Sequence, residues 1–158
     1  MRIFTGFAAM LCMALVLVWP GLAQSQDGGP LAVETVVLET AEGGVLIAAE
    51  MATTPQARER GLMFRHRLAP DRGMLFVYDA PQPVAMWMKN TNIALDIIFI
   101  RADGVVVGIA ENAVPQSEEM IESPEPALSV LEVAAGTVER IGLAIGDRVV
   151  HPVFGNLE

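Results

Sequence analysis

The stretch LDIIFIRADGVVVGIAE, residues 95–111, decides the fold of this chain. Its two apolar runs, 95–100 and 105–111, are rich in Ile and Val and are separated by Ala102-Asp103-Gly104. An Asp-Gly pair between β-branched runs is among the stronger short-range signals for a hairpin of two antiparallel strands. The stretch therefore predicts a β-hairpin.

Short apolar runs of the same character lie on both sides of this hairpin. Residues 33–40 and 45–52 flank Glu42-Gly43-Gly44 and predict a second hairpin. Single strands are predicted at residues 73–78, 84–89, 127–134 and 148–153.

Two short helices and one long loop complete the pattern. Thr54 followed by Pro55 combines a helix N-cap with proline at the first helical position, which predicts a helix over 55–63. Residues 136–142 predict one or two further helical turns, and the proline-rich, acidic segment 112–126 predicts a long exposed loop. We predict a mainly β (α+β) fold of six to eight short, mostly antiparallel strands, barrel-like or a sandwich, with one or two short helices.

The N-terminus has the layout of a secretory signal peptide. Arg2 precedes an apolar run from Phe7 to Trp19, and a small-x-Ala pattern ends at Ala23. We expect cleavage after Ala23 and a periplasmic or secreted protein, with an uncleaved membrane anchor as the alternative. The expected organisation is a signal peptide at 1–23, a flexible leader at 24–32 and a single β-rich domain at 33–154.

Charge and cysteine content narrow the classes of function. The formal net charge is −9, and removing residues 1–23 takes away Arg2 and no acid, which makes it −10. This charge argues against nucleic acid and against an anionic membrane surface as partners. The single cysteine, Cys12, lies in the predicted signal peptide, so the mature chain has no thiol for a disulfide or a nucleophile. No other apolar segment approaches the roughly 20 residues of a membrane span.

The stretch MWMKNT, residues 86–91, joins an apolar run to a cluster of polar side chains. On a strand at 84–89, Met86 and Met88 share one face, and Trp87 and Lys89 share the other. In the next strand Asp96 falls on the same face as two isoleucines, and a buried carboxylate needs a cation or several donors. We expect Lys89 to supply the cation, with Asn90 and Thr91 as further donors.

A second carboxylate and a group of arginines raise the same question of pairing. Glu132 shares a strand face with apolar residues, and Arg58, four residues before Leu62, is expected along the buried face of its helix while Arg60 points to solvent. Five arginines between residues 58 and 72, with His66 among them, suggest an anion-binding rim. Structural salt bridges are the alternative interpretation of all these pairs.

Metal and enzyme signatures are sparse. Met86 and Met88 beside Trp87 suggest a soft-metal site for Cu(I) or Ag(I), but packing in the core is the favoured interpretation, because methionine commonly fills irregular interiors and no histidine is near in sequence. His66 and His151 have no metal-ligand spacing, and the sequence lacks the G-x-S-x-G, H-E-x-x-H, phosphate-loop and dinucleotide motifs. We predict no catalytic residue, no metal and no cofactor from these patterns.

Five stretches in a fixed order carry a family resemblance: RERGLMFR (58–65), GMLFVY (73–78), WMKNTNIALDIIFI (87–100), VLEVAAG (130–136) and GDRV (146–149). Together they resemble domain of unknown function 192, also called uncharacterised protein family 0127. The resemblance implies a compact, mainly β domain, often behind a signal peptide or anchor, with no established activity, substrate or cofactor. That family usually has an aromatic residue at position 86, so the paired-methionine site is not implied by it.

Three hypotheses of function remain open. The first is a non-enzymatic exported domain that binds a small ligand, a glycan or an envelope protein. The second is an envelope hydrolase or transferase with Asp96 or Glu132 as general base. The third is a soft-metal carrier. The candidate ligand-binding residues are Arg58, Arg65, Trp87, Lys89, Asn90, Thr91, Asp96 and Glu132.

Overall fold

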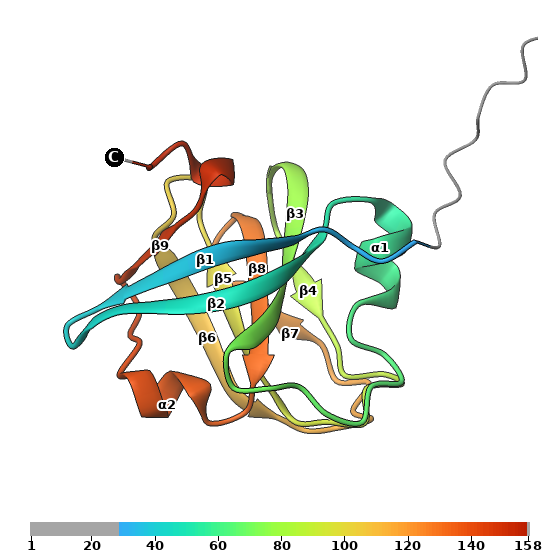
Figure 1. The fold of residues 1–158 in the computed structure, drawn as a ribbon. Helices are drawn as coiled ribbons and strands as arrows, with labels where there is room; N and C mark the ends of the chain where they lie inside the picture. The colour runs from blue at the N-terminus through green and yellow to red at the C-terminus, as the bar shows by residue number, and fades with distance from the viewer. Residues whose placement is uncertain (1–28, 158) are drawn as a thin grey trace, which may run out of the picture.

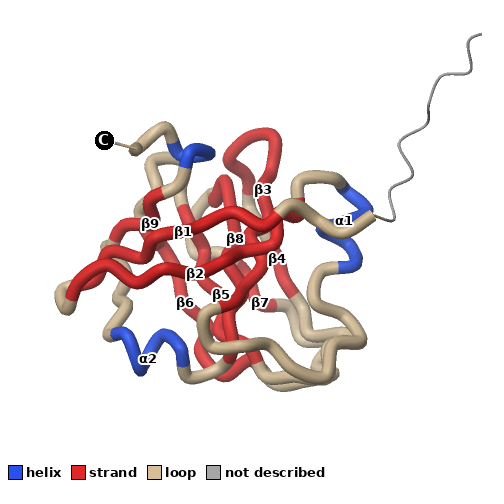
Figure 2. Tube along the Cα trace, viewed as in Figure 1, coloured by secondary structure: helices blue, strands red, loops and turns tan. Residues whose placement is uncertain are grey.

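The computed structural model describes residues 29–157 and is built mostly of strands, with short helices near opposite ends (Figure 2). The mainly β, α+β fold expected from the sequence is confirmed. The strands are β1 (Val33–Thr40), β2 (Gly43–Ala52), β3 (Arg72–Gln82), β4 (Ala85–Met86), β5 (Leu95–Ile100), β6 (Val106–Ala113), β7 (Ile121–Glu122), β8 (Ala127–Ala134) and β9 (Arg148–Val150). The helices are α1 (Pro55–Arg60), α2 (Thr137–Ile141) and a 3-10 helix (Pro152–Phe154).

Seven strands form one curled sheet in the order β6-β5-β8-β3-β2-β1-β9 (Figure 1). Neighbours are antiparallel, apart from the parallel pair β2 and β3 that α1 and its following loop connect. Val105, just before β6, forms a bridge with Arg148 of β9, so the two ends of the sheet meet. The result is a curled half-barrel sheet whose two edges touch near Val105. Strands β4 and β7 pair separately as a small second sheet.

Both predicted hairpins are present. β5 and β6 are antiparallel, and in their turn the Arg101 guanidinium donates to Asp103 at 2.8 and 3.0 Å. β1 pairs along its whole length with residues Gly43 to Glu50 of β2. The N-cap prediction also holds, because the Thr54 hydroxyl accepts a hydrogen bond from the Ala57 N–H at 3.2 Å.

Several predicted segments differ in extent. The helix expected over 55–63 ends at Arg60, with Gly61 as its C-cap, and the strand expected at 73–78 continues to Gln82. The strand expected at 84–89 is only Ala85–Met86, because its neighbours bond to the loop instead: the Val84 N–H donates to Ser123 and the Met88 N–H donates to Ser117. The loop expected at 112–126 therefore contains β7. The last strand stops at Val150, since Pro152 has no N–H for the ladder and begins a 3-10 helix.

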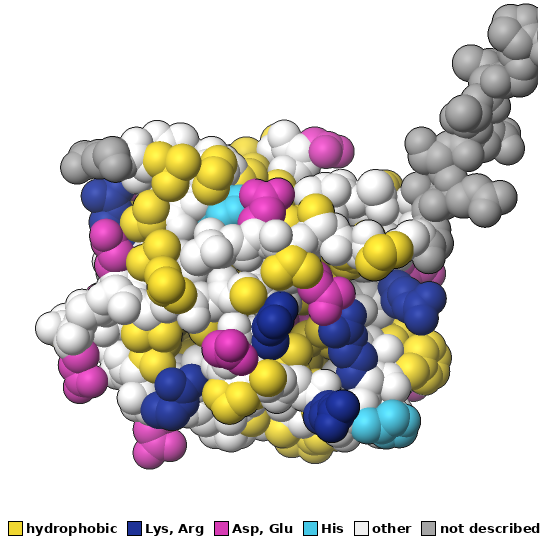
Figure 3. Space-filling model, in the orientation of Figure 1, with side chains coloured by type: hydrophobic (Ala, Val, Ile, Leu, Met, Phe, Trp, Pro, Cys, Tyr) yellow, Lys and Arg dark blue, Asp and Glu magenta, His cyan; other side chains and the backbone are white. Residues whose placement is uncertain are grey.

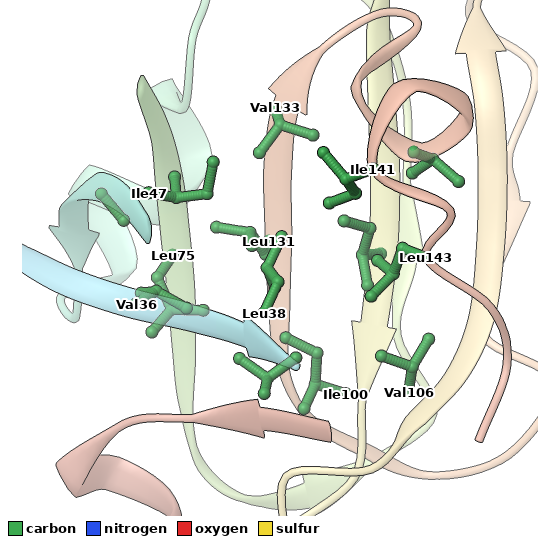
Figure 4. Packing of buried hydrophobic residues seen from close by; sticks show 14 of the residues in the cluster. Val36, Leu38, Ile47, Leu75, Ile100, Val106, Leu131, Val133, Ile141 and Leu143 are labelled. Carbon is green, nitrogen blue, oxygen red and sulfur yellow. The ribbon is translucent and has the colours of Figure 1, made fainter. Parts of the chain in front are cut away.

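The sheet separates two hydrophobic clusters. The larger packs side chains of β1, β2, β3, β5, β6 and β8 against α2 and the segment after it, and these side chains point toward one another (Figure 4). The second cluster lies on the other face, where α1, β4 and the segments around them cover the sheet. Within residues 29–157, no helix is both long enough and apolar enough to cross a membrane.

Candidate functional site

Glu132 lies in the middle of β8 and faces the second hydrophobic cluster. Its neighbours across the ladder are Met74 of β3 and Ile97 of β5, and both belong to that cluster. Directly opposite residues of adjacent strands point to the same face, so this strand register carries the carboxyl group into apolar surroundings. Glu132 is 4% exposed.

A cavity of about 300 Å³ opens above this carboxyl group. Its lining is mainly apolar and comes from α1 and its following loop, β3, β4 and the loop before β7. A volume near 300 Å³ is at the lower end of the range for small-molecule sites. The apolar lining includes Leu62, Met63, Phe76, Met86, Trp87 and Met120, and the polar lining includes Arg58, Tyr78, Thr91 and Glu132.

The Glu132 carboxyl is held without a charged partner. Among residues 29–157 no cation lies within 4.0 Å of it, and desolvation is the cause that raises its pKa to about 8. A carboxyl group with this pKa is mostly protonated at pH 7. The expectation that Glu132 is paired with a cation is therefore wrong, and a neutral group that can donate and accept hydrogen bonds lies at the cavity floor.

Asp96 has a different environment, and the prediction that Lys89 is its partner is wrong. Its Oδ1 accepts from the Asn112 N–H and its Oδ2 accepts from the Val138 N–H, both at 2.9 Å. Val138 is in the first turn of α2, whose N-cap residue Gly136 has no side chain for capping, so Asp96 caps this helix from another strand. Lys89 does not pair with Asp96, which is fully buried and does not line the Glu132 cavity.

Arg58 forms part of the cavity wall. As expected, it is half-buried and Arg60 is exposed. The Arg58 Nη1 donates to the carbonyl oxygens of Thr53 at 2.8 Å and Val77 at 2.7 Å, and the guanidinium lies 5.1 Å from the centre of the Tyr78 ring. These contacts fix the guanidinium against the edge of β3.

Trp87 separates this cavity from a shallower one. Its side chain is exposed and lines both, and the second cavity also contacts Phe64, Lys89 and Asn90. The Lys89 ammonium lies 5.2 Å from the centre of the Trp87 ring and 3.6 Å from the Glu118 carboxylate. The structure therefore places Trp87 at the Glu132 cavity, and Lys89 and Asn90 on its outer side.

Two residues beside Trp87 have left-handed backbone conformations. Phe64 has φ 65° and Asn90 has φ 57°, and the Phe64 N–H donates to the Asn90 carbonyl at 2.8 Å. Asparagine tolerates this region, but a large aromatic residue there carries strain. Thr91 follows and is buried, and its hydroxyl makes only a long hydrogen bond of 3.4 Å to the Lys89 carbonyl.

Arg65 lies apart from the Glu132 cavity. It makes two hydrogen bonds to Glu50, at 2.6 and 2.7 Å, and this partner lowers the pKa of the Glu50 carboxyl. Arg67 and Arg72 line a neighbouring depression with this pair. Figure 3 shows Lys and Arg side chains gathered on the lower right of the displayed face, close to acidic side chains.

The methionines that line one cavity are not the pair, Met86 and Met88, that the sequence suggested as a metal site. Met86 and Met88 both point inward as expected, but only Met86 lines the cavity, together with Met63 and Met120. The Met86 sulfur lies 3.9 Å from the Tyr78 hydroxyl. Hence Met86 and Met88 do not face one cavity, whereas three methionines from separate segments do.

The sequence interpretation missed several lining residues. Phe76 and Tyr78 are two residues apart on β3, and the alternation of a strand could have placed both side chains on one face. Met120 lies in the acidic loop and gave no comparable signal, because its position depends on the pairing of β7 with β4.

Comparisons with known proteins identify relatives that this chain matches over most of their length. A crystal structure from Sinorhizobium meliloti 1021, described as a "putative transcription regulator", is 48% identical and has a TM-score of 0.77, covering 79% of this chain and 98% of its own. A protein of unknown function from Novosphingobium aromaticivorans DSM 12444 is 37% identical with a TM-score of 0.76, covering 82% and 91%. No curated protein matches. Residues 36–151 match the model of DUF192, described as "Uncharacterized ACR", and the chain belongs to this family.

Proposed function

We propose that this protein is an exported binding domain that takes a small ligand into the cavity above Glu132. The observation that carries the proposal is a buried carboxyl group that has no charged partner among residues 29–157 and that lines a mainly apolar cavity. Buried polar groups are almost always hydrogen-bonded, so a site that leaves them free gains when a ligand supplies the missing partners. Trp87 gives the entrance an aromatic surface.

Support for export comes from the sequence. Arg2, the apolar run to Trp19 and the small-x-Ala pattern ending at Ala23 fit a signal peptide, and the only cysteine precedes that point. Export into the periplasm or the medium is consistent with a domain free of thiols. Mass spectrometry of the protein recovered from a periplasmic extract tests this: a mature chain that starts at Gln24 supports it, and an intact chain in the membrane fraction contradicts it.

A role as a transcription regulator, the description given to the Sinorhizobium relative, agrees poorly with the charge of this chain. A DNA-binding regulator needs a positive surface to approach phosphates. The formal net charge here is −9, and Arg65 in the arginine-rich segment is already paired with Glu50. Small-ligand binding therefore agrees better with the residues present.

A cavity-blocking variant tests ligand binding. Ala85 is exposed and lines the cavity, so Ala85→Phe fills the space without disturbing the core, while Ala80→Phe places the same bulk on β3 away from it. In a thermal-shift screen of fragments and metabolites, we expect compounds that stabilise wild type and Ala80→Phe but not Ala85→Phe. A screen in which no compound behaves this way contradicts the proposal.

An acid–base enzyme is the second candidate, and the raised pKa of Glu132 favours it. A carboxyl group with a pKa of about 8 is suited to donate a proton near neutral pH, so it would act first as a general acid rather than as the expected base. Release of p-nitrophenol from p-nitrophenyl esters and glycosides tests this candidate. Turnover that disappears in Glu132→Gln supports it, and turnover that is absent or unchanged in this variant counts against it.

A further inference from the structure

One carboxyl and two hydroxyl groups in the Glu132 cavity have weak hydrogen-bond partners, or no partner, among the described residues. The Glu132 carboxyl has no charged partner among the described residues, the Tyr78 hydroxyl reaches only the Met86 sulfur at 3.9 Å, and the Thr91 hydroxyl reaches a carbonyl at 3.4 Å. Strong hydrogen bonds between oxygen atoms are about 2.7–2.8 Å long. The cavity therefore offers three groups that can both donate and accept to a molecule within it.

The cationic side chains near the cavity are already engaged or exposed. Arg58 donates to two backbone carbonyls and covers the Tyr78 ring, and Lys89 lies outside, between Trp87 and Glu118. Arg60 lines the rim and is exposed. An anionic head group at the Glu132 carboxyl would thus have only the fixed guanidinium of Arg58 and the exposed Arg60 at the rim to balance its charge.

A cationic ligand also fits poorly. Its ammonium group would lose water among methionine, leucine and phenylalanine side chains beside the fixed guanidinium of Arg58, and an ion pair with Glu132 would first require this carboxyl to lose the proton that it holds at neutral pH. Both kinds of charge are therefore disfavoured by this lining, for different reasons. A neutral head group with both a donor and an acceptor avoids both costs.

We propose that the cavity binds an uncharged, mainly apolar molecule whose amide group exchanges hydrogen bonds with the Glu132 carboxyl, and that it rejects charged molecules of the same shape. This inference rests on the proposed function and adds the chemical class of the ligand. An amide N–H and C=O match the acceptor and donor of a protonated carboxyl group. The apolar part of the ligand would contact Leu62, Phe76 and the three methionines.

Three probes with one shared tail test the proposal. Hexanamide, hexylamine and hexanoate differ only in the head group and are small enough for about 300 Å³. Calorimetric titration of the full chain gives affinities, and ¹³C-methyl methionine spectra report contact with Met63, Met86 and Met120. We expect only hexanamide to bind and to shift these three methyl signals, and we expect Ala85→Phe to abolish the shifts.

The pH dependence of binding identifies the group that hydrogen-bonds to the amide of the ligand. The other ionisable residues lining the cavity are Arg58, Glu59, Arg60 and Tyr78, and burial raises the pKa of Tyr78 above its usual range. Since the pKa of Glu132 is about 8, loss of its proton is expected to weaken hexanamide binding about tenfold between pH 6 and pH 9. Glu132→Gln keeps a neutral donor and acceptor, so its affinity is expected to stay level over this range.

The outcomes separate the ligand class from the proposed function. Binding of hexylamine, stronger at pH 9 and lost in Glu132→Gln, overturns the neutral class but leaves a ligand site. Binding of hexanoate alone does the same. If none of the three probes shifts the methionine methyl signals, the neutral-amide class is overturned, and the fragment screen with Ala85→Phe then decides whether the cavity binds any ligand.

Discussion

Two buried carboxyl groups one register position apart show how the strand faces assign different roles. Asp96 is opposite Val133 and points into the larger cluster, whereas Glu132 is opposite Ile97 and points to the other face. Asp96 receives two backbone N–H groups and completes the first turn of α2. Glu132 receives no charged partner among residues 29–157, and its pKa rises to about 8. The first carboxyl is structural, and the second lines a cavity.

The pKa of Glu132 predicts how the free energy of unfolding depends on pH. Below pH 4.5 the carboxyl is protonated in both states, and between pH 4.5 and about 8 only the unfolded state is ionised. Folding then retains a proton that the unfolded chain releases, so stability falls as pH rises, by about 1.4 kcal/mol per unit. The whole effect is on the order of 5 kcal/mol at pH 8.

Glu132→Gln removes this titration. We expect the variant and wild type to differ little near pH 4.5 and the variant to be more stable by several kcal/mol at pH 8, as measured by urea unfolding. Every other ionisable group is common to both proteins and cancels in the difference. A difference that stays constant from pH 4.5 to pH 8 would show that Glu132 is ionised in the folded protein.

Asp96→Asn tests the structural role of the other carboxyl group. The new amide can present one oxygen to one backbone N–H but turns its NH₂ toward the second, so a buried donor loses its partner. We expect a loss of about 2–4 kcal/mol in urea unfolding. Lys89→Met is the control, because the Lys89 ammonium, among the residues that the structure describes, contacts only the exposed Glu118 carboxylate and the Trp87 ring, and its loss is expected to cost less than about 1 kcal/mol. A comparable loss in both variants would support the Lys89–Asp96 pairing that the sequence suggested.

At the scale of elements, the sequence predicts what depends on local pattern. The apolar run at 127–134 coincides with β8, and strand alternation placed the methionines of MWMKNT inward and Trp87 outward. The sequence does not predict hydrogen-bond partners that are backbone groups, because almost every residue carries such groups. Asp96, for example, accepts from backbone N–H groups 16 and 42 residues away. The sequence also does not predict that Glu132 lacks a cationic partner among residues 29–157, because the nearby Arg58 donates to backbone carbonyls instead.

The boundaries of β4 and β7 show a second limit of local pattern. The segment 84–89 has strand alternation, yet only two of its residues pair as a strand, because the Val84 and Met88 N–H groups donate to Ser123 and Ser117 of the acidic loop. This irregular pairing brings Met120 beside Met86 and Trp87 at one cavity. The candidate site therefore depends on loop contacts more than on any strand predicted from periodicity.

At the scale of the whole molecule, the two ends of the sheet are joined at Gly104, in the turn of the hairpin that decides the fold. The Gly104 carbonyl accepts from the Val149 N–H at 2.7 Å, and Val105 forms a bridge with Arg148. Asn156 adds hydrogen bonds from its side chain to the Val149 carbonyl and toward Asp103. The C-terminal segment thus closes the half-barrel against the β5–β6 turn.

Gly104→Ala is expected to disrupt this closure. A Cβ at this position would lie 2.5 Å from the Val149 carbonyl oxygen and would meet the Asn156 side chain, and φ is +85°. Both the steric conflict and the positive φ oppose alanine, so we expect a loss of at least about 3 kcal/mol in urea unfolding. Gly146→Ala is the matched control, with φ +99° and no atom within 4 Å of the new Cβ, and backbone strain alone is expected to cost about 1–2 kcal/mol. Equal losses in the two variants would show that contact between the hairpin turn and the C-terminal segment contributes little to the stability of the half-barrel.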